Sequence, residues 1–482
     1  MEAKTGAQIS IRAVLQAVFI LLILMLAAGV LTRLTPAGSY QRIEQNGRTV
    51  ILPDTFAYTE RPNYPVWRWF TAPIEVLWGS DSLVVIIIIV FILLVSASFS
   101  LLEKSGILQA ALEKIVSAFG SQKYKLLLAI TFFFMVLGAF LGLFEEVVPL
   151  TPLMIALAYS LGWDALVGLG MSILATNLGF SAALTNPFTI GVAQKLAELP
   201  AFSGFGFRLP IFLVIYAIAA VFLTRYARKI EQDPTQSLLY GVDQSIRERF
   251  SRHTTSSLLP GDRTNRSLMM FGVFVGLIIL VLISGPIFPL ISDISLPLVG
   301  ILFFAGGLSA SITAGARGQT LGRAIIDGVL GIAPGIPLIL MAASVKHIVA
   351  SGGVIDTILH SAAQTLQGAS PFAAALIIYG LALLIEFFIG SAGAKAVLMM
   401  PIILPLADLV GVTRQITVTA YCFGDGFSNL AYPTNPVLLI VLGLAGISYS
   451  RWMRWTLPLW LVVLPVTVIF LAIAVAVGLG PF

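Results

Sequence analysis

The tripeptide Thr-Asn-Pro occurs twice in the chain, at Thr185-Asn186-Pro187 and at Thr434-Asn435-Pro436. Proline interrupts the hydrogen-bond ladder of a helix, so each copy is expected to break the long apolar stretch in which it lies. Other features recur at a similar interval of about 250 residues. These features are Ser105-Gly106 with Ser351-Gly352, Pro149 with Pro401, and Leu209-Pro210 with Leu457-Pro458. We therefore expect two related halves, each with a helix broken at a matching place.

The composition is that of an integral membrane protein. Of the 482 residues, 58% are hydrophobic and 11% are charged, and the mean hydropathy is +0.97. Soluble domains carry about 25% charged residues. Several charge-free stretches of about 20 residues can cross a bilayer as helices, and the alternating pattern of a barrel is absent. We expect an all-α polytopic protein in the lipid bilayer. It is not expected to bind nucleic acid, because its basic residues are dispersed among acids.

Few residue types for catalysis or metal binding are present. The single cysteine, Cys422, excludes an internal disulfide, and the three histidines at positions 253, 347 and 360 are scattered. The sequence contains no His-Glu-x-x-His, Gly-x-Ser-x-Gly or phosphate-loop motif. We predict a protein that is not an enzyme and has no cofactor and no metal site.

Basic residues mark the cytoplasmic side of a membrane protein. Lys4 and Arg12 place the N-terminus inside, and the first apolar stretch is too long for a signal peptide core. The first half then begins outside, whereas the second begins in the cytoplasm near residue 326 and exits near Lys346. The halves therefore form an inverted repeat, with about nine crossings, two hairpins and the C-terminus outside. The expected segments are 1–35 (first transmembrane helix), 36–81 (extracytoplasmic loop), 82–229 (first repeat), 230–266 (cytoplasmic linker), 267–325 (two linking helices) and 326–482 (second repeat).

Each half also contains a pair of apolar arms that we interpret as a re-entrant hairpin. The arms are 126–144 and 147–162 around Glu145-Glu146, and 371–389 and 396–409 around Gly390-Ser-Ala-Gly-Ala-Lys395. Two ordinary spans joined by an acidic turn are the alternative for the first pair. Its short second arm and its central glycines and prolines favour a hairpin, because irregular backbone is tolerated at membrane depth only where protein or a cavity surrounds it.

The helix breaks and the hairpin tips together form the candidate binding site. Upstream of each break, free carbonyls suit a cation, and the helix that follows begins with exposed amides that suit a carboxylate. Gly and Ser at the hairpin tip let the backbone face a ligand. Small residues also serve helix packing, which needs no further function. The candidate substrate-binding residues are Ser181, Thr185, Asn186, Gly390, Ser391, Gly393, Lys395, Ser428, Asn429, Thr434 and Asn435.

Charged residues at membrane depth usually face a cavity or a partner. Lys395 can pair with a substrate carboxylate, and its alternative is a structural ion pair with Glu386 or Asp425. Asp425 lies in the second break and is a candidate ligand for a coupling ion or an amino group. Glu145 and Glu146 are further candidates for this role, and their alternative is a solvated hairpin turn.

Several short motifs carry a resemblance to a known family. They are Gly142-Leu-Phe-Glu-Glu146, Asn186-Pro-Phe, Ala193-Gln194, Ala197-Glu-Leu-Pro200, Pro405-Leu-Ala-Asp408, Arg414-Gln415, Gly424-Asp-Gly426 and Pro433-Thr434. Over nearly its whole length the chain resembles the YfcC branch of the anaerobic C4-dicarboxylate carrier (DcuC) family, within the ion transporter superfamily. The second hairpin of that family usually reads Gly-Ser-Gly-Ser-Gly-Lys. The two differences at 390–395 narrow the tip, which puts the family's substrate choice in doubt for this chain.

The resemblance implies a scaffold domain, a transport domain and a homodimer. It also implies two opposed hairpins whose tips meet the broken helices. Similar proteins include dicarboxylate carriers and basic amino-acid or arginine–ornithine antiporters, so the substrate does not follow from the family.

The leading hypothesis is a secondary active transporter or antiporter for a small carboxylate-bearing solute in the cell inner membrane. Its transport would be coupled to protons, to sodium or to exchange. Lys395 beside the acids Glu145, Glu146 and Asp425 favours a basic amino acid of the arginine or ornithine type. A C4-dicarboxylate transporter is the alternative. A membrane-embedded enzyme and a channel are alternatives from other classes.

Overall fold

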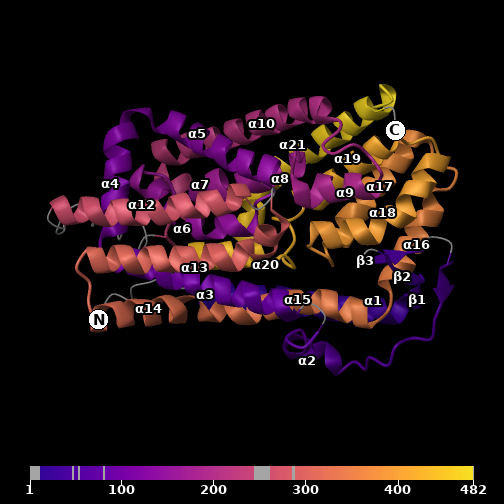
Figure 1. Ribbon diagram of the computed structural model, residues 1–482, viewed down its shortest axis with the longest axis horizontal. Helices are drawn as coiled ribbons and strands as arrows, with labels where there is room; N and C mark the ends of the chain where they lie inside the picture. Colours follow the sequence, from indigo (N-terminus) through magenta and orange to yellow (C-terminus); the bar gives the residue numbers. More distant parts are fainter. Residues whose placement is uncertain are drawn as a thin grey trace.

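The computed structural model describes residues 11–45, 48–52, 55–79, 82–243, 261–284 and 288–480. Its long helices run roughly along the longest axis of the molecule (Figure 1). Within these residues, ten helical segments are long and apolar enough to cross a membrane. A helix satisfies its own backbone hydrogen bonds, which is the requirement for crossing hydrocarbon. The expectation of an all-α polytopic membrane protein is confirmed.

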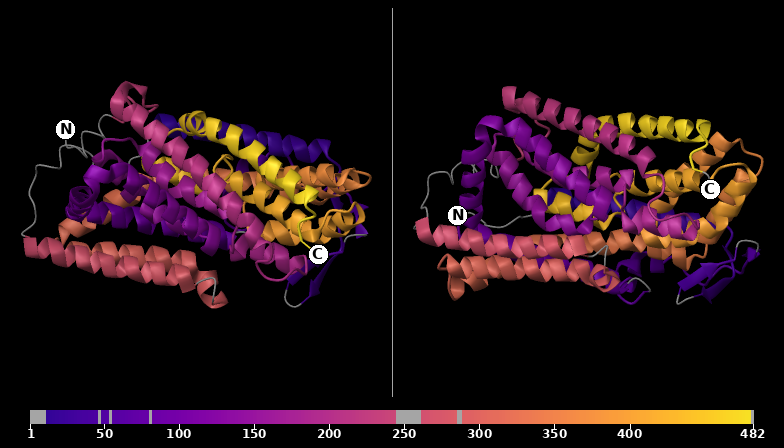
Figure 2. Two further views of the ribbon diagram at one scale, coloured as in Figure 1. Left: turned by 90° about the horizontal axis from the view of Figure 1, so that it is seen from above. Right: turned by 45° about the horizontal axis from the view of Figure 1, so that its top comes forward.

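Six helices pack against one another as one group, and we call them the scaffold helices. They are α1 (Ile11–Leu34), α3 (Ser82–Lys104), α12 (Gly261–Ser284), α13 (Pro289–Thr313), α14 (Gln319–Ile332) and α15 (Ile336–Ser351). Of these, α3, α13, α14 and α15 lie in the lower part of Figure 1. The helix α3 packs against α13 and α14, and α15 packs against α1. Small hydroxyls join these neighbours, because Ser98 Oγ donates to Phe303 O and Ser96 Oγ donates to Gly328 O, both at 2.7 Å. Figure 2 shows α12 and α13 along one edge of the molecule.

The hairpins and the broken helices form a second group, and we call this group the hairpin-bearing helices. In the first half they are α5 (Lys123–Val136), α6 (Thr151–Ser160), α7 (Ala165–Leu169), α8 (Ala175–Ala182), α9 (Val192–Leu196) and α10 (Phe205–Gln232). In the second half they are α16 (Ile355–Leu366), α17 (Pro371–Glu386), α18 (Ala392–Leu409), α19 (Arg414–Phe427), α20 (Pro436–Ala445) and α21 (Tyr449–Ala476). The short helix α4 (Ile107–Phe119) lies at one end of the molecule (Figure 1).

The first hairpin consists of α5 and α6. A π-helical turn, Leu137–Leu141, extends α5, and Gly142 ends it in the left-handed conformation with φ of 70°. A 3₁₀ segment, Glu145–Leu150, then leads into α6. The start of α5 and the end of α6 form the open end of this hairpin. They lie close together, since the ring centroids of Tyr124 and Trp163 are 5.7 Å apart.

The second hairpin consists of α17 and α18, which the short segment 387–391 connects. At its open end a Cβ on Gly411 would lie 4.0 Å from Pro371. This end points toward α16, whereas the open end of the first hairpin points toward α4, at the opposite end of the long axis (Figure 1). The two re-entrant hairpins therefore enter from opposite ends, as an inverted repeat requires, and that prediction is confirmed.

Both helix breaks lie where the sequence places them. In the first half α8 ends at Ala182, and a π-helical turn, Pro187–Gly191, begins the helix that continues as α9. In the second half α19 ends at Phe427 and α20 begins at Pro436. Each new helix starts with proline because the first helical residue needs no amide donor.

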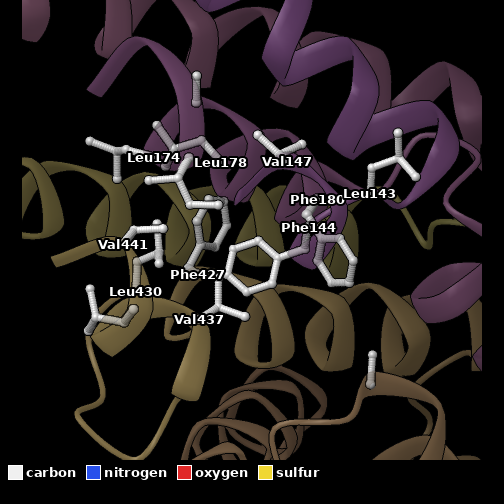
Figure 3. Close-up of a cluster of buried hydrophobic side chains, with 14 of the residues drawn as sticks. Leu143, Phe144, Val147, Leu174, Leu178, Phe180, Phe427, Leu430, Val437 and Val441 are labelled. Carbon is white, nitrogen blue, oxygen red and sulfur yellow. The ribbon is translucent and has the colours of Figure 1, made fainter. Parts of the chain in front are cut away.

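Glycines bring the hairpins and the broken helices into direct contact. A Cβ on Gly138 would lie 2.1 Å from Thr176 O, and one on Gly179 would lie 2.0 Å from Met135 O, so α5 and α8 touch through their backbones. Similarly, a Cβ on Gly426 would lie 2.4 Å from Ser181 Oγ, which joins the two broken helices. Figure 3 shows the apolar side chains around this contact, including Phe144 from the first hairpin and Val437 from α20.

A small cap follows α1. It contains β1 (Gly38–Ser39) paired antiparallel with β4 (Ala57–Tyr58), β2 (Arg42–Gln45) paired antiparallel with β3 (Arg48–Ile51), and α2 (Arg68–Glu75). Tyr40 N donates to Asp356 Oδ2 at 3.0 Å, and Arg42 forms an ion pair with Asp356 at 2.8 Å. These bonds attach the cap to α16.

Three segment boundaries differ from those expected. The helix α10 continues to Gln232, and α12 begins at Gly261, so less of 230–266 is a linker than predicted. Positions 244–260 of that linker lie outside the described residues. The helix pair α14–α15 runs from Gln319 to Ser351, so it extends at both ends beyond the expected span from near 326 to near Lys346.

We expect Gly179→Ala to lower the thermal stability of the purified protein, because the added methyl group collides with the backbone of α5. Overpacking of this kind costs about 1–3 kcal/mol. Gly380→Ala is the matched control, since a Cβ there meets nothing within 4 Å. The measurement is the unfolding midpoint in detergent. Equal midpoints for the two variants would contradict the close contact between α5 and α8.

Candidate functional site

A cavity of about 610 Å³ lies between the scaffold helices and the hairpin-bearing helices. The scaffold wall comes from α3, α13 and α15, together with Gly79 before α3. The opposite wall comes from both hairpin tips, from Phe180 and Phe188 beside the first break, and from 434–436 at the second. The cavity therefore has the size and position of a binding site for a small solute.

The first hairpin tip supplies two acids to the cavity, Glu145 and Glu146. Glu146 Oε2 accepts from the Phe144 amide at 3.2 Å, and Glu146 Oε1 accepts from Ser295 Oγ of α13 at 3.1 Å. The tip is thus bonded to the scaffold at one carboxylate. Glu146 is 9% exposed and faces the interior, whereas Glu145 is partly exposed, so the alternative of a solvated turn does not describe Glu146.

The second hairpin tip presents backbone to the same cavity. Gly390, Ser391 and Gly393 line it, and Ser391 Oγ accepts from the Ala394 amide at 3.5 Å at the start of α18. The first amides of α18 therefore face the cavity end of the hairpin. Helix N-termini carry a partial positive charge and unpaired amides, so this tip suits a carboxylate.

Each helix break is held by an asparagine. Asn186 Oδ1 accepts from the Phe188 and Thr189 amides at 2.9 and 3.3 Å. Asn435 Oδ1 accepts from the Val437 amide at 2.9 Å, and its amide donates to Asn429 Oδ1 at 3.0 Å. Both asparagines act as N-caps. The Asn of each Thr-Asn-Pro motif therefore stabilises the helix that follows the break.

Lys395 forms an ion triad with Glu386 and Asp425. Its Nζ contacts Glu386 Oε2 and lies 2.6 Å from Asp425 Oδ1. The exposed fractions are 0% for Lys395, 3% for Glu386 and 0% for Asp425. The two contacts of Lys395 Nζ are short, but neither has the geometry of a hydrogen bond. Asp425 Oδ2 has no hydrogen-bond partner among the described residues. Lys395 thus forms an ion pair with acids of the protein, which was the alternative to pairing with a substrate carboxylate.

The structure brings most but not all of the predicted site residues together. Glu145, Glu146, Gly390, Ser391, Gly393, Asn429, Thr434 and Asn435 line the cavity, whereas Ser181, Thr185, Asn186, Lys395, Asp425 and Ser428 do not. The hydroxyls in the second group bond to backbone: Ser181 to Asn177 O, Ser428 to Gly424 O and Thr185 to Phe140 O. They serve the ends of the broken helices and the first hairpin.

Four polar side chains that line the cavity were not predicted as ligands: Ser295, Lys346, His347 and Glu386. Lys346 and His347 lie inside α15, an otherwise apolar helix. A basic residue near the end of an apolar stretch is usually read as a membrane boundary. The length of the stretch to Ser351 was the signal that these residues lie within the helix.

The cap forms part of the cavity's outer rim. Glu75 at the end of α2 accepts from Arg68 Nη2 at 2.7 Å and from Thr71 Oγ1 at 2.6 Å, and its Oε2 lies 3.3 Å from His347 Nε2. The Arg68 bond, with smaller contributions from Thr71 and His347, lowers the pKa of Glu75 from 4.5 to about 2. Val76 and Gly79, just beyond this network, line the cavity.

Within the described residues, no group of three or more His, Cys, Asp or Glu side chains is arranged to hold a metal ion. The donor set of the cavity is instead made of separate carboxylates, a lysine, a histidine and backbone amides. These groups recognise an organic ion by charge and hydrogen bonding.

Opposed hairpins and two broken helices around one cavity define a membrane transporter of the inverted-repeat class. The chain belongs to the C4-dicarboxylate anaerobic carrier (DcuC) family, whose model matches residues 15–476.

Two curated relatives are each 28% identical to the chain. One is from Escherichia coli (strain K12), is named "Putative basic amino acid antiporter YfcC", and aligns over 76% of this chain and 73% of its own length. The other is an uncharacterized protein of Haemophilus influenzae, aligned over 77% of this chain and 72% of its own length. Among solved structures, the YdaH transporter of Alcanivorax borkumensis is 19% identical, with a TM-score of 0.43 over 97% of this chain and 99% of that chain.

We expect the stability of α2 to depend on pH through Glu75. Because the pKa of Glu75 is lowered, its contribution to stability is fully present above pH 4.5 and is lost as the pH falls toward 2. Amide protection of α2, measured by hydrogen exchange and corrected for the intrinsic rate, should fall over this interval.

Glu75→Gln should show low protection of α2 already at neutral pH. Glu60→Gln, an exposed acid of the same cap, is the control and should behave as the wild type. Unchanged protection between pH 4.5 and 2 in the wild type would contradict the role of Glu75.

Proposed function

We propose that the protein is a secondary active antiporter for a basic amino acid of the arginine or ornithine type. The observation that carries the proposal is the charge pattern of the cavity. Acids from both hairpins, Glu145, Glu146 and Glu386, line the same space as Lys346 and the backbone of the second hairpin tip. A basic amino acid carries a cationic side chain and a carboxylate, so it can use both kinds of group.

The carboxylate would bind at the second hairpin tip. The start of α18, at Ser391 and Gly393, offers amides with a partial positive charge, and the start of α20 at Asn435 and Pro436 lines the same cavity. Lys395 cannot contribute directly in this conformation, because its side chain has no exposed surface. Lys346 is a basic side chain that lines the cavity, next to His347.

Alternating access would move the hairpin-bearing helices relative to the scaffold helices. The cavity between these two groups supports this proposal, because relative motion would open it to one side of the membrane and then to the other. The bond between Ser295 and Glu146 spans the boundary and would have to break or slide with each movement.

The remaining parts of the proposal concern the setting of the protein. We propose an inner-membrane location with the N-terminus cytoplasmic and the C-terminus outside, exchange or a proton or sodium ion as the coupling gradient, and a homodimer. The placement of basic residues supports the orientation.

A C4-dicarboxylate transporter is the second candidate. The family description favours it, and Lys346, His347 and the two helix starts could hold two carboxylates. The three acids in the cavity oppose it, since each would repel a dianion.

The deciding measurement is counterflow in proteoliposomes. Vesicles are preloaded with arginine, ornithine or a C4-dicarboxylate, and labelled solute is added outside. We expect saturable accumulation of labelled arginine or ornithine in vesicles that contain the same solute. Protein-free vesicles are the control. Counterflow of the dicarboxylate alone would replace the proposal with the second candidate.

A further inference from the structure

The ion triad contains more negative than positive charge. Two carboxylates, Glu386 and Asp425, share the single ammonium of Lys395. When all three groups are ionised, one negative charge is left without a partner. A buried charge is stabilised only when it is paired and hydrogen-bonded, and an unpaired charge at membrane depth is costly. One further monovalent cation would balance the triad.

The three members of the triad differ in their position relative to the cavity. Glu386 lines the cavity, whereas Lys395 and Asp425 do not. Glu386 is the last residue of α17, and the chain then turns through Gly390 into the hairpin tip. A Cβ at position 390 would lie 3.8 Å from Glu386 Oε1, so this oxygen lies beside the hairpin tip, and a larger side chain at position 390 would separate it from the cavity.

The surroundings of Glu386 suit a flat organic cation. Phe387 and Phe388 follow it in the chain and line the same cavity. Aromatic faces attract cations, and a guanidinium combines such a contact with paired hydrogen bonds to a carboxylate. The acids Glu145 and Glu146 of the other hairpin increase the negative charge of the same cavity.

We propose that Glu386 binds the cationic side chain of the transported solute. The inference rests on the proposed function, because it assigns the cationic end of a basic amino acid to one carboxylate. When the solute is bound, its cation takes the place of Lys395 at Glu386, and Lys395 remains paired with Asp425. The site then contains as many positive as negative groups among these partners. When the solute leaves, the unbalanced charge returns, which disfavours movement of the empty carrier and favours exchange.

Asp425 provides a matched comparison for Glu386. Glu386→Gln and Asp425→Asn each remove one carboxylate from Lys395, and each leaves a one-to-one ion pair. They differ in that only Glu386 faces the cavity. A purely structural role of Glu386 would therefore give the two variants the same effect on ligand preference.

The test measures the affinity of the purified full-length protein for arginine and for citrulline, its neutral analogue, by ligand-induced thermal stabilisation. We expect Glu386→Gln to weaken arginine binding about tenfold or more and citrulline binding less than about threefold, as for the loss of one charged contact. Asp425→Asn should leave the ratio of the two affinities within about threefold of the wild-type ratio.

Equal loss of arginine preference in the two variants, or an unchanged preference in Glu386→Gln, would overturn the inference. If Glu386→Gln does not fold, Gly390→Val replaces it, since this change keeps all three charges and covers Glu386 from the cavity. Retained preference in Gly390→Val would then overturn the inference. A wild-type protein that binds neither arginine nor ornithine would overturn the proposed function as well, so the two failures are distinguishable.

Discussion

The structure depends on hydrogen-bond partners for the backbone amides and carbonyls that are freed where helices break at membrane depth. No water reaches the hydrocarbon core, so each amide and carbonyl freed by a break needs a partner within the protein or the cavity. Asn186 and Asn435 supply that partner on the downstream side of each break. The hairpin tips supply the surrounding protein. Ala139, in the first tip, accepts from the Thr185 amide at 3.0 Å. The breaks and the hairpins are therefore possible only together.

Close backbone contact follows from this constraint. The hairpin must approach the broken helix near enough for its carbonyls to serve as acceptors, and only glycine allows such an approach at Gly138, Gly179 and Gly426. Apolar side chains of the first hairpin and of the broken helices pack around these contacts (Figure 3). The cavity between the hairpin-bearing helices and the scaffold helices receives polar groups from both hairpins. The position of the candidate site therefore depends on the contacts that hold the two helix breaks.

The sequence predicts those features that depend on local backbone chemistry. The breaks follow from proline in apolar stretches, and the hairpins follow from short arms with Gly, Ser and Pro at their centres. The sequence predicts Glu386 or Asp425 as the partner of Lys395. It does not predict that Lys395 contacts both acids, because that contact depends on how α17, α18 and α19 pack. The sequence predicts a membrane exit near Lys346, because charge patterning locates boundaries only to within a few residues. Its role in the cavity depends on the continuation of α15 to Ser351.

The two repeats share a backbone plan but not a charge pattern. In the first, the acids Glu145 and Glu146 are at the hairpin tip, and the broken helix α8 contains no charged residue. In the second, the tip is made of small residues, and the charges lie behind it in the ion triad. Inverted symmetry alone would allow a carrier to face either side with similar energy. The charges do not follow this symmetry. Glu145, Glu146 and Glu386 line the cavity together with the starts of α18 and α20, so the charge pattern of the cavity is set by the side chains in which the two repeats differ.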